Sequence, residues 1–368
     1  MTAAPVYAPT REEKARQDFV LSLKLLANGP AQRRVREAYE REVLPELTER
    51  LGRAPAVRRD VAGVLARREE FRRWAVLTHH SQTMMWDAIE RTTARVLPDV
   101  EARYQRLRSS AGLCGSLTLD PTLEIPTPIA NTEIHRQPGG FVGKRDCEDV
   151  APGLRYLGAA AIYAVGKGQQ EASGDGRAAP ILAQLQQRFP GLEPLRILDL
   201  GCGIGVHSQA IAMAFPAAEY HAVDVAPGLL RLAHVMAEER GVPIHFHQKD
   251  AARTGFADQS FDLILSNILF HETNSARLPQ ILRECRRLLR AGGGMLHVDV
   301  PTQISRLGLA DQVMNDWQVR WNGEPFWTGF AERDMLEEIV TAGFAREQSF
   351  VDYAARLGST MYVFGARA

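Results

Sequence analysis

The sequence contains few cysteines, and they form no pattern that would hold a metal ion or a disulfide framework. The four of them lie far apart along the 368 residues and include no CxxC pair: Cys114, Cys147, Cys202 and Cys285. Zinc sites and disulfide frameworks are recognised from closely spaced cysteines. We therefore expect neither, and we predict no metal in the functional site.

The sequence also lacks an excess of charge of one sign and lacks long apolar runs. Lysine plus arginine equals aspartate plus glutamate, at 44 each, so no net positive charge indicates nucleic acid as the main partner. No run approaches the ~18 apolar residues of a membrane span, and the first residues hold no apolar core of signal-peptide length. We expect a cytoplasmic protein that binds neither nucleic acid nor membranes.

The first two segments of the chain differ in character. Residues 1–112 are predicted to form an all-helical domain, because apolar residues recur there at steps of three and four. Residues 113–177 are rich in proline, glycine and threonine, which favours a linker and lid segment. Within this second segment, residues 151–166 are predicted to form one short helix.

The third segment, residues 178–368, alternates between helix and strand patterns. This alternation is typical of an α/β fold with a doubly wound parallel sheet. The last two predicted strands, 344–355 and 359–368, have no helix between them. They are expected to pair as a hairpin, so that one strand runs antiparallel.

A glycine-rich turn follows the first strong strand of this third segment, in "ILDLGCGIGVHS" at residues 197–208. Such a turn binds nucleotide-like ligands. A triphosphate loop is excluded, because Val206 stands where that motif needs a lysine. A dinucleotide site stays possible, since Asp224 lies about 20 residues past the glycines, although the third small residue of GxGxxG is missing.

The stretches that follow decide between these ligands. "DLGCGIG", "HAVDVAPGLL", "KDAARTGFADQSFDLI" and "LRECRRLLRAGGGMLHVDV" occur in this order, and together they resemble the motifs of class I S-adenosylmethionine (SAM)-dependent methyltransferases over roughly residues 155–368. The resemblance implies a Rossmann-like seven-stranded sheet with an antiparallel last strand. It also implies SAM as the cofactor.

The resemblance assigns cofactor-binding roles to residues at the ends of the predicted strands. Glycines in the turn allow the backbone to approach the methionine part of SAM. Asp224 is expected to accept hydrogen bonds from the ribose hydroxyls and Asp250 from the adenine amine, whereas helix capping or solvent exposure is the alternative for both acids. The full predicted set is Asp199, Gly201, Gly203, Gly205, Asp224, Val225, Asp250, Ala251, Asn267 and Tyr156.

His271 is the candidate catalytic base, because it follows a strand at the ligand-binding edge of the sheet. Its position is similar to that of the histidine in small-molecule O-methyltransferases with a helical N-terminal domain. The usual His-Asp-Trp of that family is His271-Glu272-Thr273 here. Glu272 would orient the histidine; the alternatives are a capping or packing role for His271 and a helix-dipole role for Glu272.

Tyr163 and His135 are two further candidates for the catalytic site, and Tyr156 is a candidate for contact with SAM. Tyr156 and Tyr163 lie on the predicted helix 151–166, which covers bound SAM in related methyltransferases, and an aromatic face attracts a sulfonium cation. Packing in the core is the alternative for each tyrosine. His135 lies in segment 133–146, whose Pro-Gly-Gly turn favours a hinged lid, and this segment resembles one in uncharacterised bacterial methyltransferases.

These observations predict an enzyme that methylates a small molecule, of the secondary-metabolite kind, by in-line transfer from SAM. Two alternatives stay open. In the first alternative, the enzyme consumes SAM without methyl transfer and releases methylthioadenosine. In the second, the protein binds SAM or a partner without catalysis. The helical N-terminal domain is expected to close the site and to form a homodimer through its surplus apolar stripes.

Overall fold

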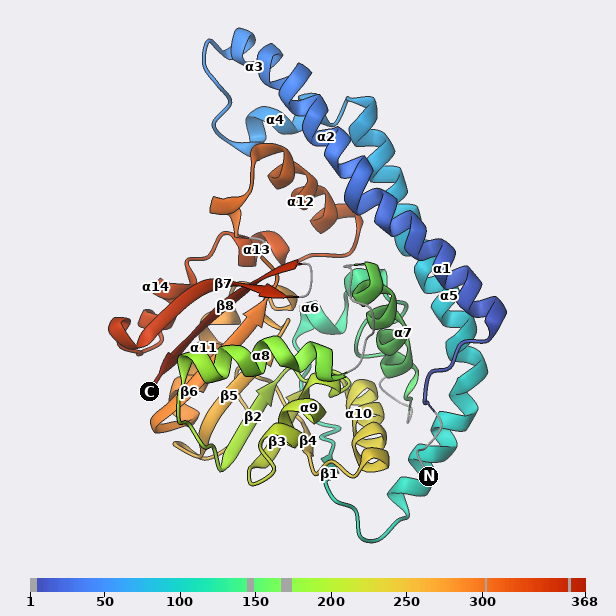
Figure 1. The fold of residues 1–368 in the computed structure, drawn as a ribbon, viewed down its shortest axis with the longest axis vertical. Helices are drawn as coiled ribbons and strands as arrows, with labels where there is room; N and C mark the ends of the chain where they lie inside the picture. The colour runs from blue at the N-terminus through green and yellow to red at the C-terminus, as the bar shows by residue number, and fades with distance from the viewer. Residues whose placement is uncertain (1–4, 144–148, 167–173, 302, 357–358) are drawn as a thin grey trace.

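The computed structural model describes residues 5–143, 149–166, 174–301, 303–356 and 359–368. A single mixed sheet forms the centre of the C-terminal part (Figure 1), with strand order β1-β4-β3-β2-β5-β6-β8-β7. The strands are β1 (Ser116–Thr118), β2 (Arg196–Leu200), β3 (Glu219–Asp224), β4 (His245–Gln248), β5 (Phe261–Asn267), β6 (Leu289–Asp299), β7 (Ser349–Arg356) and β8 (Ser359–Arg367).

The predicted doubly wound fold is confirmed, with one correction to the number of strands. Strand β8 runs antiparallel to both β6 and β7, and the other described pairings are parallel. The sheet has eight strands instead of seven, because β1 pairs with β4 at the edge. Strand β1 lies in the segment interpreted as linker. Three residues are too short to show the period-two pattern by which strands are recognised.

Helices cover both faces of the sheet. One face packs against α8 (Gly174–Arg188), α9 (Val206–Ala214) and α10 (Pro227–Arg240), and the other packs against α11 (Leu278–Leu288) and α14 (Met335–Thr341). Alternate residues of a strand point to opposite faces, so each strand contributes to both cores. Helix α8 begins at residue 174, shortly before the predicted start of the third segment at residue 178.

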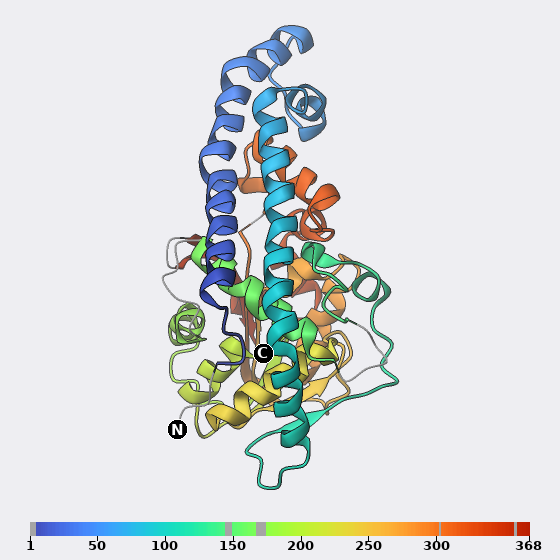
Figure 2. The same ribbon diagram turned by 90° about the vertical axis from the view of Figure 1, so that its right-hand side faces the viewer.

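The N-terminal part is helical, as predicted. The helices α1 (Arg11–Leu26), α2 (Gln32–Ala38) and α3 (Leu44–Leu51) form one nearly continuous rod, followed by α4 (Arg58–Leu65) and α5 (Glu69–Arg108). The 40 residues of α5 correspond to ~60 Å of helix, and Figure 2 shows α1 running beside it. Even so, in the described part of the chain no helix is long and apolar enough to cross a membrane.

Two prolines explain why the rod is not one regular α-helix. A proline ring lacks the N–H group and clashes with the carbonyl four residues earlier. Pro30 lies within the π-helical turn η1 (Ala27–Ala31), and Pro45 follows a second one, η2 (Tyr39–Val43). These wider turns accommodate the lost hydrogen bonds.

An insertion between β6 and β7 joins the helical rod to the sheet. It contains α12 (Leu309–Trp321) and α13 (Trp327–Ala331). The buried Ala310, Val313 and Met314 of α12 pack in one apolar cluster with side chains of α2 to α5. The predicted domain limits at residues 112 and 177 stay a prediction, because the helical region also takes in this later segment.

The remaining elements lie between the rod and the sheet. They are the helix α7 (Ala151–Gly166), with the bounds predicted from the sequence, and the short elements α6 (Thr127–Ala130), η3 (Ile134–Arg136), η4 (Phe270–Glu272), η5 (Ile304–Arg306) and η6 (Arg346–Gln348). Helix α7 packs against both α5 and α10. Helix α7 therefore lies between the long helix α5 and the sheet domain.

Candidate active site

The glycine turn leaves β2 and leads into α9 at the carboxyl edge of the sheet. Gly201, Gly203 and Gly205 all have positive φ angles, of 66°, 56° and 67°. Residues with a Cβ atom adopt such angles only at a cost in free energy. At Gly201 a Cβ would also lie 2.6 Å from Cδ1 of Leu269. The turn therefore needs glycine there for two independent reasons.

Asp224 ends β3 beside this turn. Its Oδ2 accepts a hydrogen bond from the backbone N–H of Gly203 at 2.9 Å, and its Oδ1 accepts one from Ala226 at 2.9 Å. Burial raises the pKa of this carboxyl, against the lowering effect of the backbone donors. Asp224 thus fixes the shape of the turn in addition to its predicted role toward ribose.

Asp199 lies underneath the turn and is fully buried. It accepts hydrogen bonds from Ser208 Oγ at 2.6 Å and Tyr220 Oη at 3.1 Å, and His207 Nε2 lies 3.0 Å from it. These contacts connect β2, α9 and β3 below the ligand surface. The predicted contact of Asp199 with SAM stays a prediction.

A cavity of about 60 Å³ lies beside Asp224 on the predicted adenine side. Val225, Asp250 and Ala251 line it together with Gly201. Asp250 accepts the backbone N–H of Ala252 at 2.9 Å and forms an ion pair with Arg277. The structure therefore places these four predicted cofactor residues around one recess.

A larger cavity of about 350 Å³ continues from the glycine turn toward the helical rod. Gly201, Gly203, Asn267 and Tyr156 of the predicted cofactor set line it. Gly205 is absent from the described lining of both cavities; a Cβ there would lie 3.2 Å from Phe246, so this glycine serves close packing.

The backbone beyond Asn267 is strained at the edge of this cavity. Ile268 has a φ of 62°, which is rare for a β-branched residue. Its N–H donates to Val298 O at 2.7 Å, which holds the turn against β6. Asn267 lines the larger cavity, and among the described residues its Oδ1 is buried without a hydrogen-bond partner.

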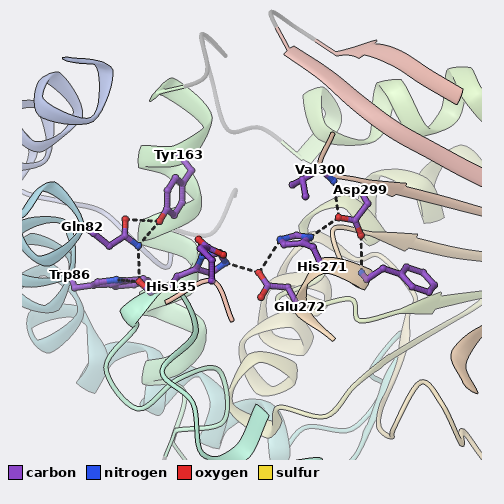
Figure 3. A network of polar contacts seen from close by, with 10 residues as sticks. Gln82, Trp86, His135, Tyr163, His271, Glu272, Asp299 and Val300 are labelled. Atoms are coloured by element: carbon purple, nitrogen blue, oxygen red, sulfur yellow. Dashed lines mark hydrogen bonds and ion pairs between the residues drawn. The ribbon is translucent and has the colours of Figure 1, made fainter. Parts of the chain in front are cut away.

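His271 lies in η4 and is held by two carboxylates (Figure 3). Its Nδ1 lies 2.6 Å from Asp299 Oδ1, and its Nε2 lies 3.2 Å from Glu272 Oε1. Burial lowers the pKa of His271, but the charges of Asp299 and Glu272 outweigh burial and raise the pKa to about 10. The ligand-free imidazole is therefore protonated at neutral pH.

His135 approaches the same carboxylate from the opposite side. Its Nε2 lies 2.6 Å from Glu272 Oε1, and its Nδ1 lies 2.6 Å from Glu324 Oε1. Burial lowers the pKa of His135, and the two carboxylates outweigh this effect and raise it well above the ordinary value. Burial raises the pKa of Glu272, but the charges of the two histidines outweigh burial and hold this pKa well below its ordinary range.

Helix α5 fixes the position of His135. Gln82 Nε2 and Trp86 Nε1 on α5 donate to the carbonyl oxygen of His135 at 2.6 Å and 2.7 Å. Gln82 also exchanges hydrogen bonds with Tyr163 Oη on α7 and accepts one from Lys24 Nζ on α1 at 2.5 Å. Burial lowers the pKa of Lys24 to about 8.

The four predicted catalytic residues thus line one cavity together: His135, Tyr163, His271 and Glu272. Sequence reasoning missed their partners Asp299, Glu324, Gln82 and Lys24. Asp299 ends β6 at the ligand edge, and the argument that selected Asp224 also applied to it. The predicted lid segment 133–146 is described only to residue 143, and residues 144–146 lie outside the described part.

Comparison with known proteins agrees with this geometry. Residues 197–293 match a family model described as "Methyltransferase domain". The malonyl-[acyl-carrier protein] O-methyltransferase of Methylococcus capsulatus is 38% identical over 166 residues, which are 43% of this chain and 55% of that protein. A ubiquinone biosynthesis O-methyltransferase of Cereibacter sphaeroides is 30% identical over 151 residues, which are 40% of this chain and 59% of that protein.

The chain therefore spans little more than half the length of these curated relatives. A solved phosphoethanolamine N-methyltransferase 2 of Haemonchus contortus in complex with SAM aligns with a TM-score of 0.40 at 16% identity, over 50% of this chain and 51% of that chain. A likeness that low supports no conclusion about this chain. The segment 197–293 holds the glycine turn, Asp224 and Asp250, and the chain therefore contains a class I SAM-dependent methyltransferase domain with SAM as its cofactor.

Proposed function

We propose that this protein is an enzyme that transfers the methyl group of SAM to a small molecule bound in the larger cavity. The observation that carries the proposal is the continuity of this cavity. It runs from the glycine turn to the His271–Glu272–His135 network and is also lined by side chains of α1, α5 and α7. Its volume of about 350 Å³ lies at the lower end of small-ligand sites.

The residues at the carboxyl edge fit SAM. Gly201 and Gly203 line the larger cavity without side chains, and Asn267 lines it beside them. Bound SAM supplies an electrophilic methyl group. The protein's own contribution is to hold the acceptor atom in line with that group and to keep water out, which lowers the barrier through orientation.

At the far end of the cavity, His135, His271 and Glu272 would bind and orient the acceptor. The base role of His271 stays a prediction, and the structure attaches a condition to it. A base must be neutral and must reach the acceptor with Nε2, yet the pKa of His271 is raised to about 10 and Glu272 lies against Nε2. An acceptor that displaces Glu272 would free Nε2 and would remove one of the two charges that raise the pKa of His271.

Two relatives are named for O-methylation, so small molecules with a hydroxyl or carboxyl group are the first acceptors to test. The purified protein is incubated with SAM and a metabolite extract, and both the cofactor product and the methylated product are measured by mass spectrometry. We expect S-adenosylhomocysteine together with a product heavier by one methylene.

A second incubation with SAM alone separates the alternatives. If methylthioadenosine forms without any acceptor, the enzyme catalyses a reaction within SAM, and the proposed methyl transfer is wrong. SAM binding without turnover in either incubation would indicate a non-catalytic binding protein. Asp224→Ala, compared with the exposed Asp258→Ala as a matched control, shows whether any product depends on the SAM site.

A further inference from the structure

We propose that His135, His271 and Glu272 bind a divalent transition-metal ion at the acceptor end of the cavity. Nε2 of each histidine is directed at the same carboxylate oxygen, Glu272 Oε1, at 2.6 Å and 3.2 Å (Figure 3). One ligand atom from each of the three residues lies within 4.8 Å of the others. Two imidazoles and one carboxylate around one point form a common metal-binding set.

The second nitrogen of each histidine is also placed as metal ligation requires. Histidines that bind metals nearly always donate their other ring nitrogen to a carboxylate or carbonyl, which fixes the ring and the nitrogen that faces the ion. Here Asp299 holds Nδ1 of His271 and Glu324 holds Nδ1 of His135, both at 2.6 Å. Both of these outer carboxylates are buried.

A divalent cation fits the charges around the site. The carboxyl groups of Glu272, Asp299 and Glu324 hold the two histidines, and Lys24 lies nearby. In the ligand-free protein, the protons on His135 and His271 compensate these carboxyl groups, which raise the pKa of both histidines. A divalent ion that replaces the two protons would leave the total charge of the buried site unchanged.

The backbone at His135 is strained, as is common at functional sites. His135 and Arg136 adopt positive φ angles of 54° and 58°, and strained residues persist where the surroundings fix them and often mark functional sites. The backbone of His135 donates its N–H to Gly323 O at 2.6 Å and accepts hydrogen bonds from α5. An ion bound by both His135 and His271 would connect segment 133–143 to η4, which follows strand β5 of the sheet.

Imidazole with one carboxylate suits Zn²⁺ or Fe²⁺ better than Mg²⁺ or Ca²⁺, which prefer oxygen ligands. Three protein ligands leave open positions on the ion, and His135, His271 and Glu272 all line the larger cavity. The ligand class for these positions is an acceptor with oxygen donors. As a metal ligand, His271 would not serve as a base, so this proposal replaces both that role and the expected absence of metal.

The test uses the full chain, stripped with a chelator and dialysed. Co²⁺ is added and the visible absorption of the bound ion is recorded, and Zn²⁺ binding is measured by calorimetry. We expect one ion per chain. His135→Ala and Glu272→Gln should weaken binding by about 100-fold or more, and Glu324→Gln by about 10-fold, as found for outer partners of metal ligands.

The matched control is His80→Ala, which removes an exposed histidine from the same helix that supports the site. It should bind the ion like the wild type. Thermal melting and S-adenosylhomocysteine binding show that each variant is folded. No Co²⁺ spectrum and no Zn²⁺ binding by the folded wild type, or equal binding by His80→Ala and His135→Ala, would overturn the proposal. Because the readout is metal binding, its failure leaves the proposed methyl transfer untouched.

Discussion

Replacing Asp224 by alanine should weaken cofactor binding far more than it weakens the fold. Both carboxylate oxygens already accept a backbone N–H, from Gly203 and Ala226 at 2.9 Å each. The substitution removes the predicted ribose contacts and also the restraint on the glycine turn. Hydrogen bonds to a charged group contribute ~1.5–3 kcal/mol each, so the loss of two raises Kd by about 100-fold or more.

The stability of the ligand-free protein should change little. Burial raises the pKa of Asp224, which means that its charged form is less favourable in the folded than in the unfolded protein at neutral pH. Removing the charge relieves this penalty and offsets part of the two lost backbone hydrogen bonds. Binding sites commonly carry such a compromise between function and stability.

Asp224→Asn refines the test. The asparagine side chain has one acceptor oxygen, so its amide group must face the backbone N–H of either Gly203 or Ala226. Asn should therefore bind S-adenosylhomocysteine almost as poorly as Ala does. Calorimetry gives the Kd and thermal melting gives the stability, with the exposed Asp258→Ala as control. Unchanged binding, or a loss of binding that only follows unfolding, would refute the reasoning.

Three further predictions concern other parts of the molecule. Gly201→Ala should abolish S-adenosylhomocysteine binding in calorimetry, whereas Gly241→Ala, with the same φ of 66° and no described atom within 4 Å of the new Cβ, should only lower the melting temperature. Stability should fall as pH rises from 6.5 through about 10, because the pKa of His271 is raised and its protonated form is favoured in the folded state; melting of His271→Gln should show a smaller slope, since His135 keeps a raised pKa. Phe19 and Leu26 are exposed seven residues apart on one face of α1, at 56% and 43%; the predicted homodimer should dissociate in the Phe19→Glu, Leu26→Glu double variant by light scattering, and a monomeric wild type would contradict it.

The sequence by itself determined the elements and the cofactor edge. Helix α7 has the predicted bounds, and helices and strands alternate in the third segment as predicted. The glycine turn and Asp224 lie where the motif placed them. These features follow from local physics, because periodic apolar residues set helices and strands, and a turn with positive φ needs glycine. An edge strand of three residues, β1, is too short for this signal.

Only the tertiary structure decided how the acceptor end is built. His271 meets Asp299 across 28 residues of sequence, and His135 meets Glu272 and Glu324 across 137 and 189. Nothing local links these residues, since their approach depends on the order of the sheet and on the packing of α12 against the helical rod. The protonation of both histidines depends on these carboxylates and on burial, which exist only in the folded chain.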